Sequence, residues 1–254
     1  MNFFKSKKAI FITPVVLWLL SQLFLARPQF FFLVITAGFL LLALVVRGSE
    51  KNKQNQNWPL FFFFPALFFL SVSLYITFLP NYYWIQIILL LSAYFSFSYL
   101  RNIYYFFHYG ASERAERLDG LMLSGGFLSV FALASSLYGL PTFLSWNFWG
   151  LLPLFVILVS PLFFQSFVLG RINIRDNWPL FLSASLVLAE MTAVIYFLPL
   201  SFNILGFFTA IFYYFILLVL RLFLKNNFSG NNLRWPLSFG IILIIILLLS
   251  SRWF

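Results

Sequence analysis

Glu190 is the residue with the clearest potential for chemistry, because it is the only acidic side chain inside a long apolar run. It stands 11 residues after Pro179 and 9 before Pro199. At a rise of 1.5 Å per residue, a helix between these prolines would hold it about 16 Å and about 13 Å from its two ends. In a bilayer this position is near the midplane, where an ionisable group costs about 2.5–3.5 kcal/mol and normally faces protein or water.

Two roles for Glu190 remain open. In a carrier, a carboxyl group at the midplane can bind and release protons or ions. In a structural role, it stays protonated inside the protein and forms hydrogen bonds. The polar residues that we expect around it are Gln165, Thr192 and Tyr213. No Lys or Arg stands at a matching depth in another apolar run to form an ion pair with it.

The densest charge of the chain lies between His108 and Gly120. Apart from the histidine, the charged residues of this segment are Glu113, Arg114, Glu116, Arg117 and Asp119. As a helix it would pair Glu113 with Arg117 at i, i+4, which stabilises a helix only slightly. We expect a solvated turn between two helices, and the alternative is a docking site for a cytoplasmic protein. One histidine among groups of both charges does not indicate a metal site.

The composition excludes several kinds of site. There are no cysteines and one histidine, which rules out disulfides, thiol nucleophiles, thiolate-bound metals and sites with two histidines. The sequence has no phosphate-binding glycine loop, no zinc-protease motif and no serine–histidine pair inside an apolar run. We therefore expect no cofactor and no metal. An enzyme would have to work with Glu190, or with His108 and its acidic neighbours.

The elements that would position these residues are transmembrane helices. Of the 254 residues, 63% are hydrophobic and 9% charged, whereas soluble domains have about 45–50% and about 25%. Apolar runs bounded by charges or prolines fall at Ala9–Ala26, Phe30–Val46, Pro59–Leu79, Tyr82–Leu100, Leu121–Leu140, Phe148–Leu169, Pro179–Leu198, Phe202–Leu220 and Pro236–Leu249. The last is short and reaches spanning length only with its flanking tryptophans. We expect an all-α, polytopic helical membrane protein with about nine transmembrane helices.

The basic residues predict the orientation of these helices. If the nine runs cross a bilayer, fourteen of the sixteen Lys and Arg residues fall on one side, and only Arg27 and Arg252 fall on the other. Basic residues accumulate on the cytoplasmic side and attract anionic headgroups. We therefore expect a plasma-membrane protein with a cytoplasmic N-terminus, an external C-terminus and anionic lipid at its cytoplasmic face. The net charge of +10 then requires no nucleic acid as a partner.

An internal repeat organises the expected helices. Residues 57–61 recur at 177–181, and Phe78-Leu79-Pro80 recurs 119 residues later. Four helices separate the copies, so the repeats would have the same orientation, related by an axis along the membrane normal. We expect a first four-helix unit over 1–119, a second over 120–225, and a cytoplasmic loop with one extra helix over 226–254. The counterpart of Glu190 is Leu70, so chemistry at Glu190 would not be duplicated.

Small residues predict where helices approach one another closely. The fifth expected helix carries Gly125, Ser129 and Ala132, and the seventh carries Ser185, Ala189 and Ala193. Spacing of three or four residues places them on stripes, which allow close packing of helix backbones in a membrane. We expect these two helices to be central, which would bury Glu190 in protein.

Three functions from different classes fit these observations. A non-catalytic membrane subunit or scaffold is favoured, because insertion and packing explain almost every residue; a protein partner would bind through the cytoplasmic loops. A small transporter or lipid-handling carrier would use the repeat and Glu190. An intramembrane enzyme acting on a lipid is disfavoured, because acid–base groups are scarce.

Overall fold

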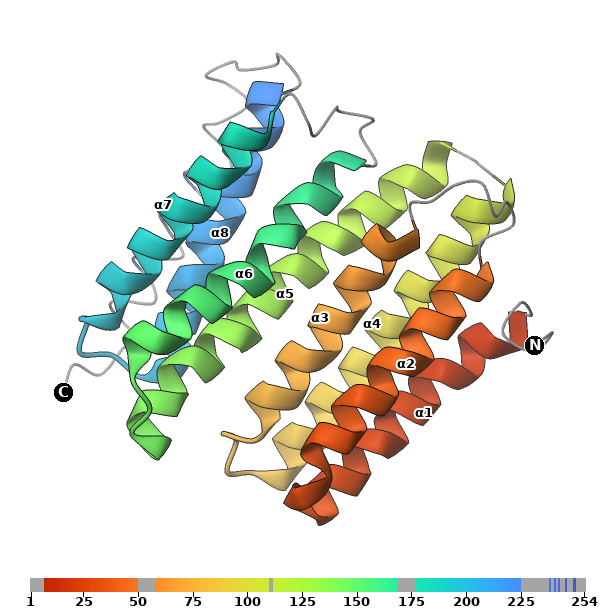
Figure 1. Cartoon of the computed structure of the whole chain (residues 1–254), viewed down its shortest axis with the longest axis horizontal. Coiled ribbons are helices and arrows are strands. Elements are labelled where there is room, and N and C mark those ends of the chain that lie inside the picture. Colours follow the sequence, from red (N-terminus) through yellow and green to blue (C-terminus); the bar gives the residue numbers. More distant parts are fainter. Residues whose placement is uncertain are drawn as a thin grey trace. The chain divides into compact units, whose positions relative to one another are not determined.

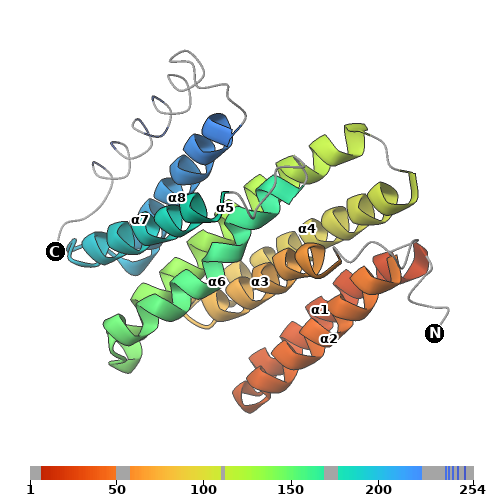
Figure 2. The same cartoon turned by 45° about the horizontal axis from the view of Figure 1, so that its top comes forward.

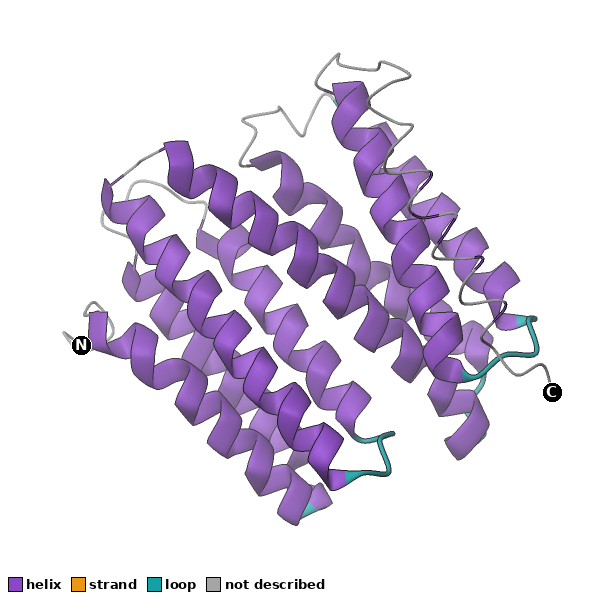
Figure 3. Ribbon diagram, turned by 180° about the vertical axis from the view of Figure 1, so that it is seen from behind, coloured by secondary structure: helices purple, strands orange, loops and turns teal. Residues whose placement is uncertain are grey.

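The computed structural model describes residues 7–49, 58–109, 112–168 and 177–224, together with positions 238, 240, 242, 245 and 249. Of Lys7, Leu60, residues 112–115 and residues 165–168, only the backbone is described. Within these ranges every regular element is a helix (Figure 3). A helix satisfies its own backbone hydrogen bonds, which an apolar chain in lipid must do.

The eight α-helices among the described residues follow the order of the first eight expected runs, and a short 3-10 helix lies between the first two. They are α1 (Lys7–Ala26), the 3-10 helix η2 (Pro28–Phe30), α2 (Phe31–Ser49), α3 (Trp58–Ile76), α4 (Tyr82–Tyr109), α5 (Ser112–Leu144), α6 (Phe148–Val168), α7 (Trp178–Tyr196) and α8 (Phe202–Leu224) (Figure 1). In the described part of the chain, six helices are long and apolar enough to cross a membrane. The apolar stretches of the other two, α3 and α6, are shorter. These helices indicate a membrane-embedded protein. The ninth expected span, 236–249, lies mostly outside the described residues.

The chain divides into two compact units, Met1–Gly126 and Phe127–Phe254, and the boundary falls inside α5. In the first unit, α1 packs on α2 and α4, while α3 packs on α2 and α4 (Figure 1). In the second unit, α7 packs on both α6 and α8, and Figure 2 shows α7 and α8 side by side. The division of the sequence at residues 119 and 225 stays a prediction.

Polar and proline residues mark the helix ends at three connections. The Asn81 side-chain oxygen accepts a hydrogen bond from the Tyr83 backbone N–H at the start of α4, and Asn147 does the same for Trp149 at the start of α6. These asparagines satisfy N–H groups that have no partner within the helix. Pro80 and Pro199 lie between helices, as their turn-forming character predicts.

The ends of two helices differ from the expected bounds. The expected run Leu121–Leu140 stops before Pro141, but Pro141 lies inside α5, which continues to Leu144. The following Ser145 has a positive φ of 54° and ends the helical geometry. The expected turn between residues 108 and 120 is also mostly helix, since α4 continues to Tyr109 and α5 begins at Ser112. The reason is that Glu, Arg and Ala in this segment are good helix formers, so charge does not end a helix.

Candidate functional site

Glu190 lies on the exposed face of α7, so the prediction that protein buries it is wrong for the described structure. The buried face of α7 carries Phe181, Ala184, Ser185, Leu188, Thr192 and Ile195. Successive helix residues are about 100° apart, so Glu190 points about 200° away from Leu188 and from Thr192. Its neighbours on the exposed face are apolar: Leu186 is 62% and Val194 is 63% exposed.

The other residues expected around Glu190 lie elsewhere in the second unit. The Thr192 hydroxyl is fully buried and donates to the Leu188 carbonyl at 2.7 Å. Tyr213 is buried on α8, with its ring centroid 5.1 Å from that of Phe163 on α6. Gln165 belongs to α6, and its side chain is outside the description. The structure therefore does not join Thr192 and Tyr213 to Glu190.

Thr192 instead belongs to a polar group in the core, which sequence reasoning did not identify. The Tyr138 hydroxyl of α5 lies 2.9 Å from the Thr192 carbonyl oxygen, to which it donates, and 2.9 Å from the Thr209 hydroxyl of α8. Tyr138 is buried. These contacts join three helices through one side chain. Threonines inside apolar runs were the available signal, but their partners are 54 and 71 residues away from them in the chain.

Parallel aromatic rings cover this polar group. The rings of Phe148 and Tyr196 stack at a centroid distance of 3.9 Å with an angle of 4° between their planes. Tyr138 lies parallel to both, at 5.9 Å from Phe148 and 6.4 Å from Tyr196. Buried rings of this kind exclude water and hold the Tyr138 hydroxyl in place. The side-chain oxygens of Tyr138, Thr192 and Thr209 all have hydrogen-bonding partners within this arrangement, which is typical of a structural role.

The small residues lie at close contacts, but not all between the two helices on which they were predicted. Gly125 of α5 leaves room for the rings of Phe64 and Phe95, which a β-carbon would overlap. Ser129 and Ala132 are buried, and the Ser185 hydroxyl accepts a hydrogen bond from Ser160 of α6 at 3.0 Å. Ala189 and Ala193 are half-buried.

A close helix approach in the second unit involves a glycine that was not predicted. A β-carbon on Gly206 of α8 would lie 2.7 Å from the Ser135 backbone nitrogen and 2.8 Å from its α-carbon, both on α5. Backbone atoms cannot move aside as a flexible side chain can, so this contact requires glycine. A lone glycine in an apolar run gave no periodic signal of its own.

The charged segment of residues 108–120 forms a helix end. Glu116 and Arg117 are exposed on the first turns of α5, and Glu113 and Arg114 are described by their backbone alone. His108 is engaged locally: its Nδ1 lies 2.9 Å from the Tyr104 carbonyl, to which it donates, and its ring stacks on that of Tyr104 at 4.0 Å. In the described residues, no three His, Cys, Asp or Glu side chains are grouped as metal ligands would be.

The first unit contains a polar pair that sequence reasoning also missed. Gln22 of α1 and Gln86 of α4 form two reciprocal amide hydrogen bonds of 2.8 and 2.9 Å. Both side chains are half-buried. Each amide uses its N–H as donor and its oxygen as acceptor, so the pair is mutually satisfied. A single glutamine in each of two apolar runs was the available signal.

Among the described helices that are long and apolar enough to cross a membrane, Glu190 is the one acidic or basic side chain exposed in the middle. It is joined to no other described residue by a hydrogen bond or ion pair, and it has apolar neighbours on its own face. Such a group can accept a proton, or it can receive a donor from another molecule. Comparisons with protein families, with curated proteins and with solved structures find no match to this chain.

Proposed function

We propose that this chain is a non-catalytic membrane subunit or scaffold that binds another membrane protein through the exposed face of α7. The observation that carries the proposal is the position of Glu190 in the middle of that face. In hydrocarbon an ionised carboxylate costs about 2.5–3.5 kcal/mol. A partner helix with a donor or a cation at the same depth removes this cost and forms a hydrogen bond.

The rest of the face fits a helix-binding surface. Its exposed apolar residues include Leu182, Leu186 and Val194 on α7 and Phe197 directly after it, spaced by three, four or eight residues. Aliphatic side chains in lipid gain little from the hydrophobic effect, so helix pairs in membranes depend on packing and on interhelical hydrogen bonds. Glu190 would supply the hydrogen bond and these residues the packing.

The test is native mass determination of the protein extracted in mild detergent from its own membrane. We expect a second protein in a fixed ratio, which is retained in the control Thr36→Val and lost in Glu190→Leu. Thr36 is an exposed polar residue whose hydroxyl donates only within α2, so its replacement removes polarity without touching α7. The proposal fails if no second protein is present, or if Glu190→Leu retains it as fully as the control does.

A small transporter or lipid-handling carrier is the second candidate. The position of Glu190 near the midplane favours it, and so do the helix bounds: α3 and α7 are both 19 residues long, and they begin at Trp58 and Trp178. This shared offset supports a parallel repeat. A monomer or a symmetric homo-oligomer carrying lipid or solute, with flux that depends on pH and disappears in Glu190→Gln, would establish this function instead.

We propose the plasma membrane as the location, with the N-terminus in the cytoplasm and the C-terminus outside. The distribution of Lys and Arg supports this orientation. The chain has no cysteine, so single cysteines can report the side of each connection. A membrane-impermeant maleimide should label Tyr83→Cys in intact cells and Lys53→Cys only after permeabilisation, and the reverse pattern would overturn the orientation.

A further inference from the structure

A small cavity lies within the first unit, between α1, α3 and α4. It is lined by Leu17, Trp18, Ser21, Phe68, Phe69, Ser92, Ala93 and Ser96. Trp18 is eight residues from the end of α1 and Ser92 ten from the start of α4, or about 12 Å and about 15 Å along their helices. Both depths are near the middle of a hydrocarbon layer about 30 Å thick.

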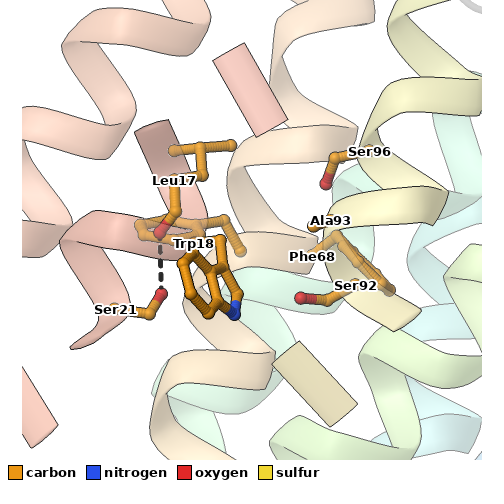
Figure 4. Close-up of a pocket in the computed structure, with 8 residues that line it drawn as sticks. Leu17, Trp18, Ser21, Phe68, Ser92, Ala93 and Ser96 are labelled. Carbon is orange, nitrogen blue, oxygen red and sulfur yellow. Dashed lines mark hydrogen bonds between the residues drawn. The ribbon is translucent and has the colours of Figure 1, made fainter. Parts of the chain in front are cut away.

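Some polar atoms around this cavity have hydrogen-bonding partners, and one does not. The Trp18 indole nitrogen is buried and has no hydrogen-bonding partner among the described residues. An indole N–H is a donor only, so it requires an acceptor. Figure 4 shows Trp18 between Ser21 and Ser92, with its nitrogen on the side of Ser92.

The serines offer acceptor oxygens at this site. The Ser21 hydroxyl donates to the Leu17 carbonyl at 2.9 Å, and the Ser92 hydroxyl donates to the Leu89 carbonyl at 2.8 Å. Their hydrogens are thus used within their own helices, and each oxygen keeps lone pairs that can accept. A small group that accepts from the indole and donates to hydroxyl oxygens would complete these contacts.

The size of the cavity determines what that group is. Its interior volume is about 10 Å³, which is about the space that one water molecule needs. We propose that the cavity binds a single water molecule, which accepts from the Trp18 N–H and donates to serine oxygens of α1 and α4.

Such a water would extend the polar contact between α1 and α4 inward from the membrane surface. Gln22 follows Trp18 by four residues, one helical turn closer to the end of α1. The Gln22–Gln86 pair and the water would then join the same two helices at neighbouring levels. This inference concerns the first unit and does not depend on a partner at α7.

Nuclear magnetic resonance of the full chain, labelled with ¹⁵N-tryptophan in lipid nanodiscs, tests the proposal. We expect a cross-peak from the Trp18 indole proton to water with the sign of a long-lived bound molecule. Trp18→Phe assigns the signal by removing it. If that variant does not fold, Ala93→Val provides a second assignment, because added methyl groups fill the cavity and only the Trp18–water contact should disappear.

Three results would overturn the proposal. The first is a Trp18 indole proton without a water cross-peak in the wild type. The second is a cross-peak from that proton to lipid acyl protons, which would mean that an acyl chain fills the space. The third is a water cross-peak that persists in folded Ala93→Val. The control is Ser183→Ala, which removes an exposed hydroxyl on α7 and should leave the Trp18 signal unchanged.

Discussion

The reciprocal amide pair of Gln22 and Gln86 should contribute measurably to the stability of the first unit. Hydrogen bonds between membrane helices average about 0.6 kcal/mol and reach about 1.7, so two such bonds give about 1.2 kcal/mol and at most about 3.4. Replacing one glutamine with leucine breaks both bonds and leaves the other amide unpaired. A buried unpaired amide carries a further penalty of about 1–3 kcal/mol. Gln86 is four residues from the start of α4, about 6 Å from the helix end, so it can turn toward the interface and this penalty should be small.

The double variant isolates the interaction. We expect Gln22→Leu and Gln86→Leu each to destabilise the protein by about 1–2 kcal/mol, and the double variant to cost about 1 kcal/mol less than their sum. The assay is reversible unfolding in mixed micelles of increasing dodecyl sulfate, followed by circular dichroism. Thr36→Val controls for the loss of a polar group, since the Thr36 hydroxyl bonds only within its own helix. Costs that add to within about 0.3–0.5 kcal/mol would refute the pairing.

Two further predictions concern the second unit, measured by the same unfolding assay. Tyr138→Phe should lower the stability by about 0.6–1.7 kcal/mol, because it removes the hydroxyl that contacts Thr192 and Thr209. The control Tyr94→Phe, at a residue 70% exposed, should be neutral. Equal effects of the two substitutions would contradict the buried polar group. Gly206→Ala should lower the stability by about 1–3 kcal/mol through overpacking against Ser135. The control Gly150→Ala, with open space around it, should be neutral or stabilising. A tolerated Gly206→Ala would exclude the close approach of α5 and α8.

Helix positions could be predicted from the sequence because their boundaries are chemical. The expected starts at Tyr82, Phe148 and Phe202 coincide with those of α4, α6 and α8, and those at Pro59 and Pro179 are one residue late. Asparagine caps and proline mark these points strongly. The end of α4 and the start of α5 were not predicted, because the charged segment between them is made of good helix formers and gives no stop signal.

The candidate site was harder to predict because α7 carries apolar side chains on nearly every face. In a soluble helix the polar face identifies the buried one. In α7, Leu188 in the core and Leu186 on the exposed face are the same residue type, so the sequence does not indicate the face on which Glu190 lies. The partners of Gln22 and Tyr138 were missed for another reason: these contacts join helices distant in the chain, and composition carries no information about which helices are neighbours.

The Gln22–Gln86 pair can form only some time after α1 has been synthesised. The two residues are 64 positions apart, so at about 5–20 residues per second the partner of Gln22 follows about 3–13 s after it. The Thr13 and Ser21 hydroxyls of α1 donate to carbonyls one turn earlier in their own helix and need not wait. The Gln22 amide donates to Gln86 and the Trp18 indole to no carbonyl of its own helix, so we expect α1 to need another polar group, such as interfacial water, at these two side chains until α4 is in place.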